Sequence, residues 1–157
     1  MSAADVRNAP AGVAIEKVTQ RPEAAADTAE IERARADRAH RAAMQRFPKV
    51  VGDLVELVGA PLVAYITNIS ETRALRQWIS GERVPHPSTQ TKLQLALQVA
   101  TYLVEEGEDG AVEAWFQGLN PSLDDHAPAE LIRNTERTDL PSIGRKILAA
   151  AKEFANS

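Results

Sequence analysis

Apolar residues recur along this chain at the spacing of an α-helix. From Phe47 onward they repeat every three or four positions, and each group is followed by glycine, asparagine or proline. That period places side chains on one face of a helix, whereas no segment alternates convincingly with the two-residue period of a strand. The pattern therefore predicts an all-α domain of about six or seven helices.

The residues that end each apolar group set the expected helix boundaries, because Ser and Pro favour helix starts while Gly favours helix ends. The expected helices in the first part are one opened by Pro48 and ended at Gly59, a short one containing 62–66, a third from Glu71 to Ile79 capped by Ser70, and a long one capped by Ser88 and reaching about Glu106. The later ones are a helix through Trp115 ended by Gly118, a short helix opened by Pro128, and a last helix beginning around Pro141.

Four regions follow from this reading. Residues 1–28 carry too few apolar side chains for a core and are expected to form a disordered arm. Residues 29–46 are rich in helix formers and arginine but poor in apolar positions, which indicates either a solvated helix or an arm that touches nucleic acid or a second subunit. Residues 47–87 form a helix-turn-helix-like region, and residues 88–157 form a C-terminal domain.

Composition limits the possible functions. The chain has 157 residues, 44% of them hydrophobic and none of them cysteine, which fits one core plus tails in a reducing cytoplasm. We expect no export signal and no membrane segment, because no apolar run approaches the length that either requires. The three histidines are far apart, and no phosphate loop or nucleophile motif is present, so we expect no metal, no cofactor and no enzymatic activity.

Charge is distributed unevenly along the chain. Residues 70–95 carry four basic and two acidic side chains, while residues 96–157 carry five basic and eleven acidic ones. A nucleic-acid contact is therefore expected only locally, in the middle of the chain. The acidic C-terminal part is suited to a basic partner surface.

The middle segment has the order expected of a helix-turn-helix, in which a scaffold helix and a tight turn precede a recognition helix. In the second helix Leu75 and Trp78 are expected to pack inward. The residues expected to face DNA are Thr72, Arg73, Arg76, Gln77 and Arg83. Ordinary three-helix packing with a polar outer face remains an alternative for this segment.

Further along, Trp115 and Phe116 are expected to be core residues, because an aromatic pair beside a glycine turn commonly anchors one helix on another. Asp124, Asp125 and His126 are interpreted as a turn that caps the following helix rather than as an acid/base site.

The two segments together resemble the Xre/MbcA/ParS family of bacterial antitoxins, over roughly residues 48–157. The segment ETRALRQWISGERVPHPSTQTKLQLALQVATYL is similar to the helix-turn-helix of Xre-type regulators. The family's C-terminal motif combines an Ala-Trp-apolar group, an Asn-Pro turn, a Leu and a Pro-x-x-Leu helix start. These elements correspond here to Ala114, Trp115, Phe116, Asn120, Pro121, Leu123, Pro128 and Leu131. Asp125 departs from the pattern, since glycine is common at that position.

The resemblance implies an antitoxin whose C-terminal part covers the active site of a RES-domain toxin that degrades NAD, and family members can also bind their own promoter DNA. Because a helix-turn-helix usually binds a two-fold symmetric DNA site, we also expect a homo-oligomer. The residues expected to contact the toxin are Asp124, Asp125, Lys152, Glu153, Phe154 and Asn156. A helix-turn-helix regulator or phage-type repressor without a toxin is the alternative function. A structural scaffold with neither partner is a third.

Overall fold

The computed structural model describes the backbone of residues 2–157 and the side chains of residues 24–157. The chain divides into two units, residues 1–42 and residues 43–157. Most of the expected disordered arm, residues 1–28, lies outside the residues whose side chains are described.

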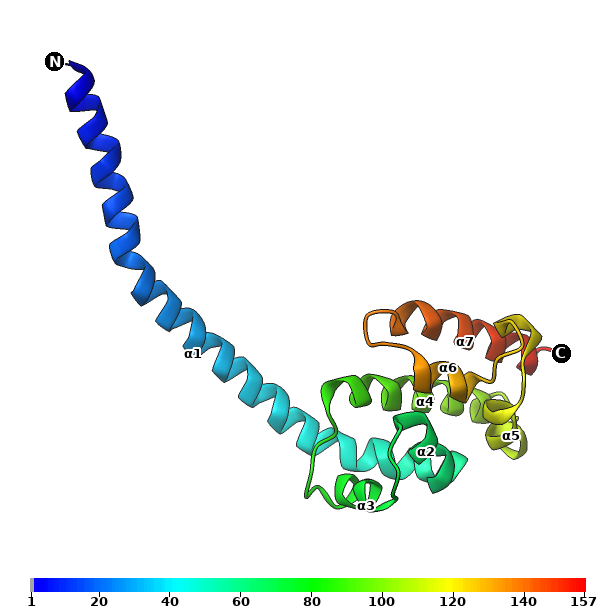
Figure 1. The fold of residues 1–157 in the computed structure, drawn as a ribbon. Helices are drawn as coiled ribbons and strands as arrows, with labels where there is room; N and C mark the ends of the chain where they lie inside the picture. Colours follow the sequence, from blue (N-terminus) through cyan, green and yellow to red (C-terminus); the bar gives the residue numbers. More distant parts are fainter. Residues whose placement is uncertain (1) are drawn as a thin grey trace. The chain divides into compact units, whose positions relative to one another are not determined.

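All regular secondary structure in the described part is helical, as the sequence predicts (Figure 1). One isolated bridge joins Asn120 and His126. Its α-helices are α1 (Ser2–Val58), α2 (Ala60–Thr67), α3 (Arg73–Ser80), α4 (Pro87–Glu105), α5 (Val112–Gln117), α6 (Pro128–Asn134) and α7 (Leu140–Ala155). Two short 3₁₀ helices, η1 (Asp109–Ala111) and η2 (Pro121–Leu123), flank α5. The seven α-helices agree with the predicted number.

Helix α1 differs from the prediction at Pro48. A separate helix was expected to open there, but α1 continues without a break to Val58. Proline disfavours a helical conformation in the residue before it and removes one backbone donor. Phe47 and Val51 are nevertheless buried on either side of Pro48, and this packing outweighs the local preference. The helix ends before Gly59, which has φ 88°, a conformation that glycine adopts without strain.

Helices α2 and α3 are joined by a turn that begins at Asn68, which has a left-handed conformation with φ 58°. The expected third helix begins two residues later than predicted, at Arg73, with Thr72 in the N-cap position. The prediction that Ser70 caps this helix was wrong. Leu75 and Trp78 are both buried, as predicted.

Helix α4 lies at the centre of the unit formed by residues 43–157. It contacts α2, α5, α6 and α7, and Figure 1 shows α7 running alongside it. Its N-cap is His86, whose ring nitrogen accepts a hydrogen bond from the Ser88 backbone N–H, so the prediction of a Ser88 cap was wrong. Burial of the α4 face, together with the apolar faces of α2, α5 and α7, produces one continuous core.

No single helix in the described part is both long and apolar enough to cross a membrane. Residues 24–58 and α2 have the length and composition of a membrane span only when they are taken together, and a 118° bend separates them.

Candidate functional site

The loop between α5 and α6 is organised by Asn120. Its side-chain oxygen accepts from the backbone N–H of Ser122, and its backbone carbonyl accepts from the N–H groups of Leu123 and Asp125. Its own N–H donates to the carbonyl of His126 at 3.2 Å. These bonds close residues 120–126 into a compact loop. Asn120 is the N-cap of η2 and Pro121 occupies its first position, which are positions that these two residue types favour.

Asp124 and Asp125 lie at the tip of this loop and are exposed. Both have left-handed backbone conformations, with φ 56° and 62°. Aspartate tolerates this region better than most residues, but glycine adopts it with less strain. A glycine at position 125 would therefore adopt this backbone conformation with less strain, whereas the aspartate adds a negative charge there.

The last turns of α7 lie beside this loop. The Ser122 hydroxyl donates to the Glu153 carboxylate at 2.5 Å, and α7 contacts η2 along the same edge. Lys152, Glu153 and Asn156 are exposed. The structure thus brings the two groups of residues that we expected to contact a toxin, the acidic turn and the end of the last helix, to neighbouring positions.

Three aromatic rings hold this arrangement from inside. Trp115 contacts Phe116 edge to face, with ring centroids 5.4 Å apart, and contacts Phe154 at 6.5 Å. Trp115 and Phe116 are buried, as predicted. Phe154 was expected to contact a toxin, but its half-buried ring packs on Trp115. This contact fixes the end of α7 to α5, and a toxin contact by the exposed part of the ring stays a prediction.

Leu119 was not among the expected contact residues, although it lies between Phe116 and Asn120 of the C-terminal motif. Its side chain is 74% exposed, the largest value among the bulky apolar residues of the described part. A single exposed apolar side chain is common on protein surfaces, but this one lies beside the two exposed aspartates and is therefore available to the same partner. The signal in the sequence was its position between Gly118 and Asn120, outside any helix.

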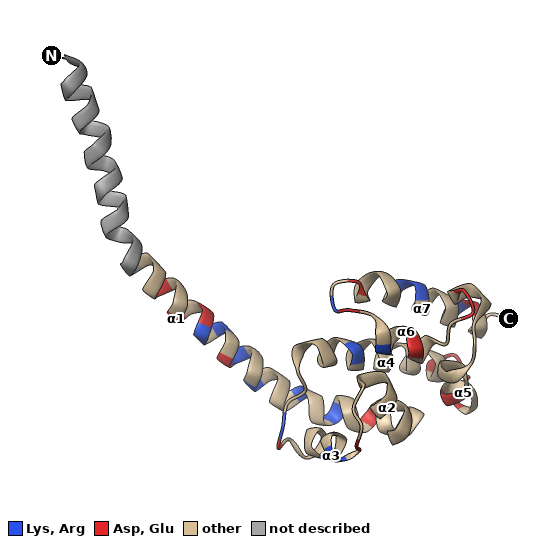
Figure 2. Cartoon of the chain, viewed as in Figure 1, with Lys and Arg blue, Asp and Glu red and all other residues tan. Residues whose placement is uncertain are grey.

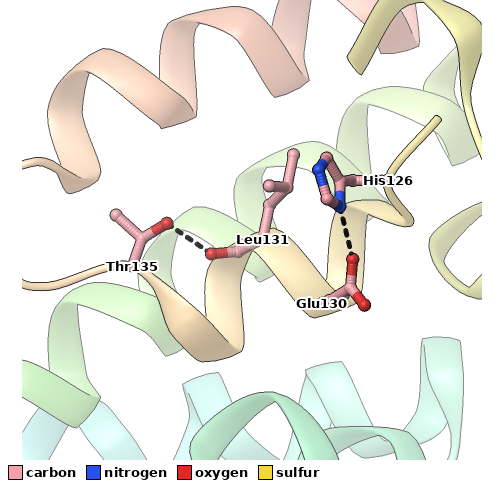
Figure 3. A network of polar contacts seen from close by, with 4 residues as sticks. All are labelled: His126, Glu130, Leu131 and Thr135. Atoms are coloured by element: carbon pink, nitrogen blue, oxygen red, sulfur yellow. Dashed lines mark hydrogen bonds and ion pairs between the residues drawn. The ribbon is translucent and has the colours of Figure 1, made fainter. Parts of the chain in front are cut away.

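Helix α6 follows the loop and is held at both ends (Figure 3). The His126 Nδ1–H donates to the Glu130 carboxylate at 2.7 Å at its start, and the Thr135 hydroxyl donates to the Leu131 carbonyl at its end. The Ala127 N-cap has no side-chain hydrogen bond, so the predicted capping role of the Asp124–His126 turn is not fulfilled by a direct cap. His126 instead reaches forward into the first turn of α6.

Helix α6 also contacts α2. The Arg133 guanidinium lies over the Tyr65 ring at 4.5 Å and donates to the Tyr65 carbonyl at 3.1 Å. The Arg133 carbonyl accepts from the Lys92 ammonium at 2.7 Å. Burial, and then the positive charge of Arg133, lower the pKa of Lys92 below its ordinary value.

A separate open cavity of about 590 Å³ lies on the α3 surface. Arg73, Gln77 and Arg83, three of the five residues expected to face DNA, line it. Arg83 Nη1 donates to the Gln77 side-chain oxygen at 3.1 Å, which orients both side chains. Arg76 is exposed outside the cavity lining, and Thr72 lies in the turn before α3 rather than within the helix.

The two surfaces differ in charge (Figure 2). Three arginines lie on or next to α3, at positions 73, 76 and 83, with Glu71 before them and Glu82 beside the last, whereas the loop tip carries two aspartates. The first surface is suited to anions such as phosphates, and the second to a basic protein surface. Among the described side chains no three His, Asp or Glu residues are close enough together to hold a metal ion.

Comparison of the chain with protein-family models, with curated proteins and with solved structures gives no match.

Proposed function

We propose that this chain is a cytoplasmic type II antitoxin of the Xre/MbcA/ParS kind, which binds a RES-domain toxin that degrades NAD and covers its active site. The observation that carries the proposal is the joining of the acidic loop to the end of α7 by Ser122 and Glu153. One small module therefore carries Asp124 and Asp125, the exposed Leu119 and the end of α7.

The chemistry of the partner supports this assignment. A pocket that binds the phosphates of a dinucleotide requires positive charge, and carboxylates complement such a pocket. The loop carries its charges on a backbone closed by the Asn120 hydrogen bonds. A preorganised loop loses less conformational entropy on binding than a flexible one.

The test first asks whether the neighbouring gene encodes a RES-domain toxin, and then uses that toxin together with the full chain. Asp124→Asn with Asp125→Asn removes the charge and retains a residue type that tolerates a left-handed conformation. Leu119→Ala removes the apolar anchor. We expect each change to weaken toxin binding by at least about tenfold and to restore NAD hydrolysis by the toxin.

The matched control is Glu105→Gln with Glu106→Gln, which removes two exposed carboxylates from the end of α4. This pair should leave toxin binding unchanged. Deleting α7 is a poor test, because Ile147 and Ala151 belong to the core and the shortened chain would lose stability as well as contacts. Equal inhibition of the toxin by the Asn variants and the parent chain would exclude the occlusion mechanism.

A second candidate function, transcriptional repression, is favoured by one specific observation, the orientation of Arg83 by Gln77 beside Arg73 on the α3 surface. We propose that this surface binds the promoter of the same operon, or of other genes if no toxin exists. Arg73→Ala and Arg76→Ala should each weaken binding to upstream DNA and reduce its salt dependence by about one unit. The control is Arg145→Ala, which removes an exposed arginine from α7 and should leave DNA binding unchanged.

A further inference from the structure

The helix before the globular unit carries exposed charges in an ordered pattern. None of residues 24–42 is buried. Figure 2 shows acidic residues followed by basic ones along this part of α1. Residues 27–32 contain three acidic and no basic side chains, and residues 33–41 contain four arginines and one aspartate. The two ends of this segment therefore have opposite charge.

Helical geometry places part of this charge on one stripe. With about 100° per residue, eleven residues complete three turns to within about 20°. Asp27 and Arg38 are eleven residues apart, as are Glu30 and Arg41. All four therefore lie on the same side of α1. Ile31 and Ala34 lie between them on that side. We call these six residues the α1 stripe.

The α1 stripe has the symmetry of a surface that binds its own copy. If two helices run antiparallel with the two-fold axis at Ala34, position 27 faces position 41, and position 30 faces position 38. Asp27 then faces the second copy's Arg41, and Glu30 faces its Arg38, which gives four ion pairs across the axis. In a parallel pair, by contrast, each charge would face an identical charge.

The centre of the stripe suits close approach. Ala34 is small and lies on the axis, which allows two helix backbones to come together. Ile31 is 57% exposed, but in this register it faces the second copy's Asp37, so it adds little apolar burial. Within the described part of the chain none of the four charged residues forms an ion pair. Their charges are thus available to a second molecule.

We infer that residues 27–41 form an antiparallel homodimer interface, in which charge sets the register and orientation. Few apolar groups lie on the stripe, so the ion pairs determine specificity more than affinity. This inference does not rest on the proposed toxin-binding function. Nucleic acid is the competing partner for the arginines, and the experiment distinguishes binding to nucleic acid from binding to a second copy.

Three variants of the full chain test the inference. The first, Asp27→Arg with Glu30→Arg, makes the stripe entirely basic. The second, Arg38→Glu with Arg41→Glu, makes it entirely acidic. The third combines all four changes and exchanges the two ends. Far-ultraviolet circular dichroism and thermal unfolding check that each variant keeps the globular unit folded.

Sedimentation equilibrium and native mass spectrometry measure the association. The parent chain should form a dimer that weakens as salt rises from about 0.1 M to about 1 M. The basic and acidic variants should each dimerise at least about tenfold more weakly. Their equimolar mixture should form a heterodimer as tight as the parent dimer, and the fourfold variant should again form a homodimer.

Three results would overturn the inference. A parent chain that is monomeric at all concentrations has no such interface. Unchanged dimers of the basic and acidic variants would mean that another surface associates. A mixture that remains monomeric would exclude the antiparallel register. In the first of these cases, tighter DNA binding by the basic variant would assign the segment to nucleic acid instead.

Discussion

The Ser122 hydroxyl donates a hydrogen bond to the Glu153 carboxylate, which joins η2 to the last turns of α7 across 31 positions of the sequence. Both residues are exposed, so solvent screens the interaction and its contribution to stability is small. Its effect is therefore on the position of the end of α7 relative to the acidic loop.

Ser122→Ala and Glu153→Ala should each lower the free energy of unfolding by no more than about 1 kcal/mol. The double variant should cost little more than one of the single ones, because both remove the same bond. Urea unfolding measures the cycle. Hydrogen exchange should show faster exchange for amides near the C-terminus in all three variants. Purely additive energies would mean that the bond is not formed in solution.

Asp125→Gly should stabilise the chain by about 0.5–1 kcal/mol, because glycine adopts φ near 62° with less strain than aspartate. Thermal unfolding checks this result. Arg145→Gly, at an exposed position inside α7, should have the opposite sign and destabilise by about 1 kcal/mol. A loss of stability in Asp125→Gly would show that the carboxylate, rather than the backbone, determines the residue at this position.

Gly144 is the point at which α7 approaches α4 closely. A Cβ atom added there would lie 3.1 Å from Leu95 Cδ1 and 3.4 Å from Cδ2. Gly144→Val should therefore overpack this contact and lower stability by about 1–3 kcal/mol. Leu95→Ala should be less destabilising in the Gly144→Val background than in the parent chain, as measured by urea unfolding. Equal costs in the two backgrounds would contradict the close approach.

The Lys92 ammonium makes stability depend on pH. Burial and Arg133 hold the pKa of Lys92 below its ordinary value of 10.5, so the folded chain binds fewer protons than the unfolded chain just below that pH. The penalty for the charged lysine is fully present at neutral pH and is relieved as pH rises toward 10.5. The parent chain should therefore gain stability over this range relative to Lys92→Met.

Urea unfolding at a series of pH values from about 8 upward measures this difference. Burial, and then Glu106, raise the pKa of the Tyr102 hydroxyl, which contributes a slope of the opposite sign. That slope is common to both proteins, so their difference isolates Lys92. A difference that does not change with pH would show that the environment of Lys92 leaves its proton affinity unaltered.

Much of the helical pattern could be predicted from the sequence, because the apolar period and the punctuating residues are local signals. Gly59, Asn68 and Gly118 mark helix ends in the sequence and in the structure. Pro48 misled the prediction, since the burial of Phe47 and Val51 on either side outweighs its local preference. Rules that use only neighbouring residues in the sequence do not include such tertiary packing.

The candidate site was less predictable for the same reason. The order of the Trp-Phe pair and the Asn-Pro turn indicated a module, but the bond between Ser122 and Glu153 depends on a tertiary arrangement. The contact between the Phe154 and Trp115 rings also depends on the tertiary arrangement, so no local pattern predicts it. The position of Leu119 between Gly118 and Asn120 indicated a residue outside any helix, but only the structure gives the extent of its exposure.

The exposed segment of α1 has a consequence for how this protein assembles. An isolated helix of this length is marginal in water, because propensity alone barely offsets the loss of backbone entropy. Residues 24–42 contain no buried side chain, so packing within the chain does not supply the missing stabilisation. If contact with a second copy supplies this stabilisation, folding of the segment is a bimolecular reaction. Its helix content then depends on how much of the protein the cell makes.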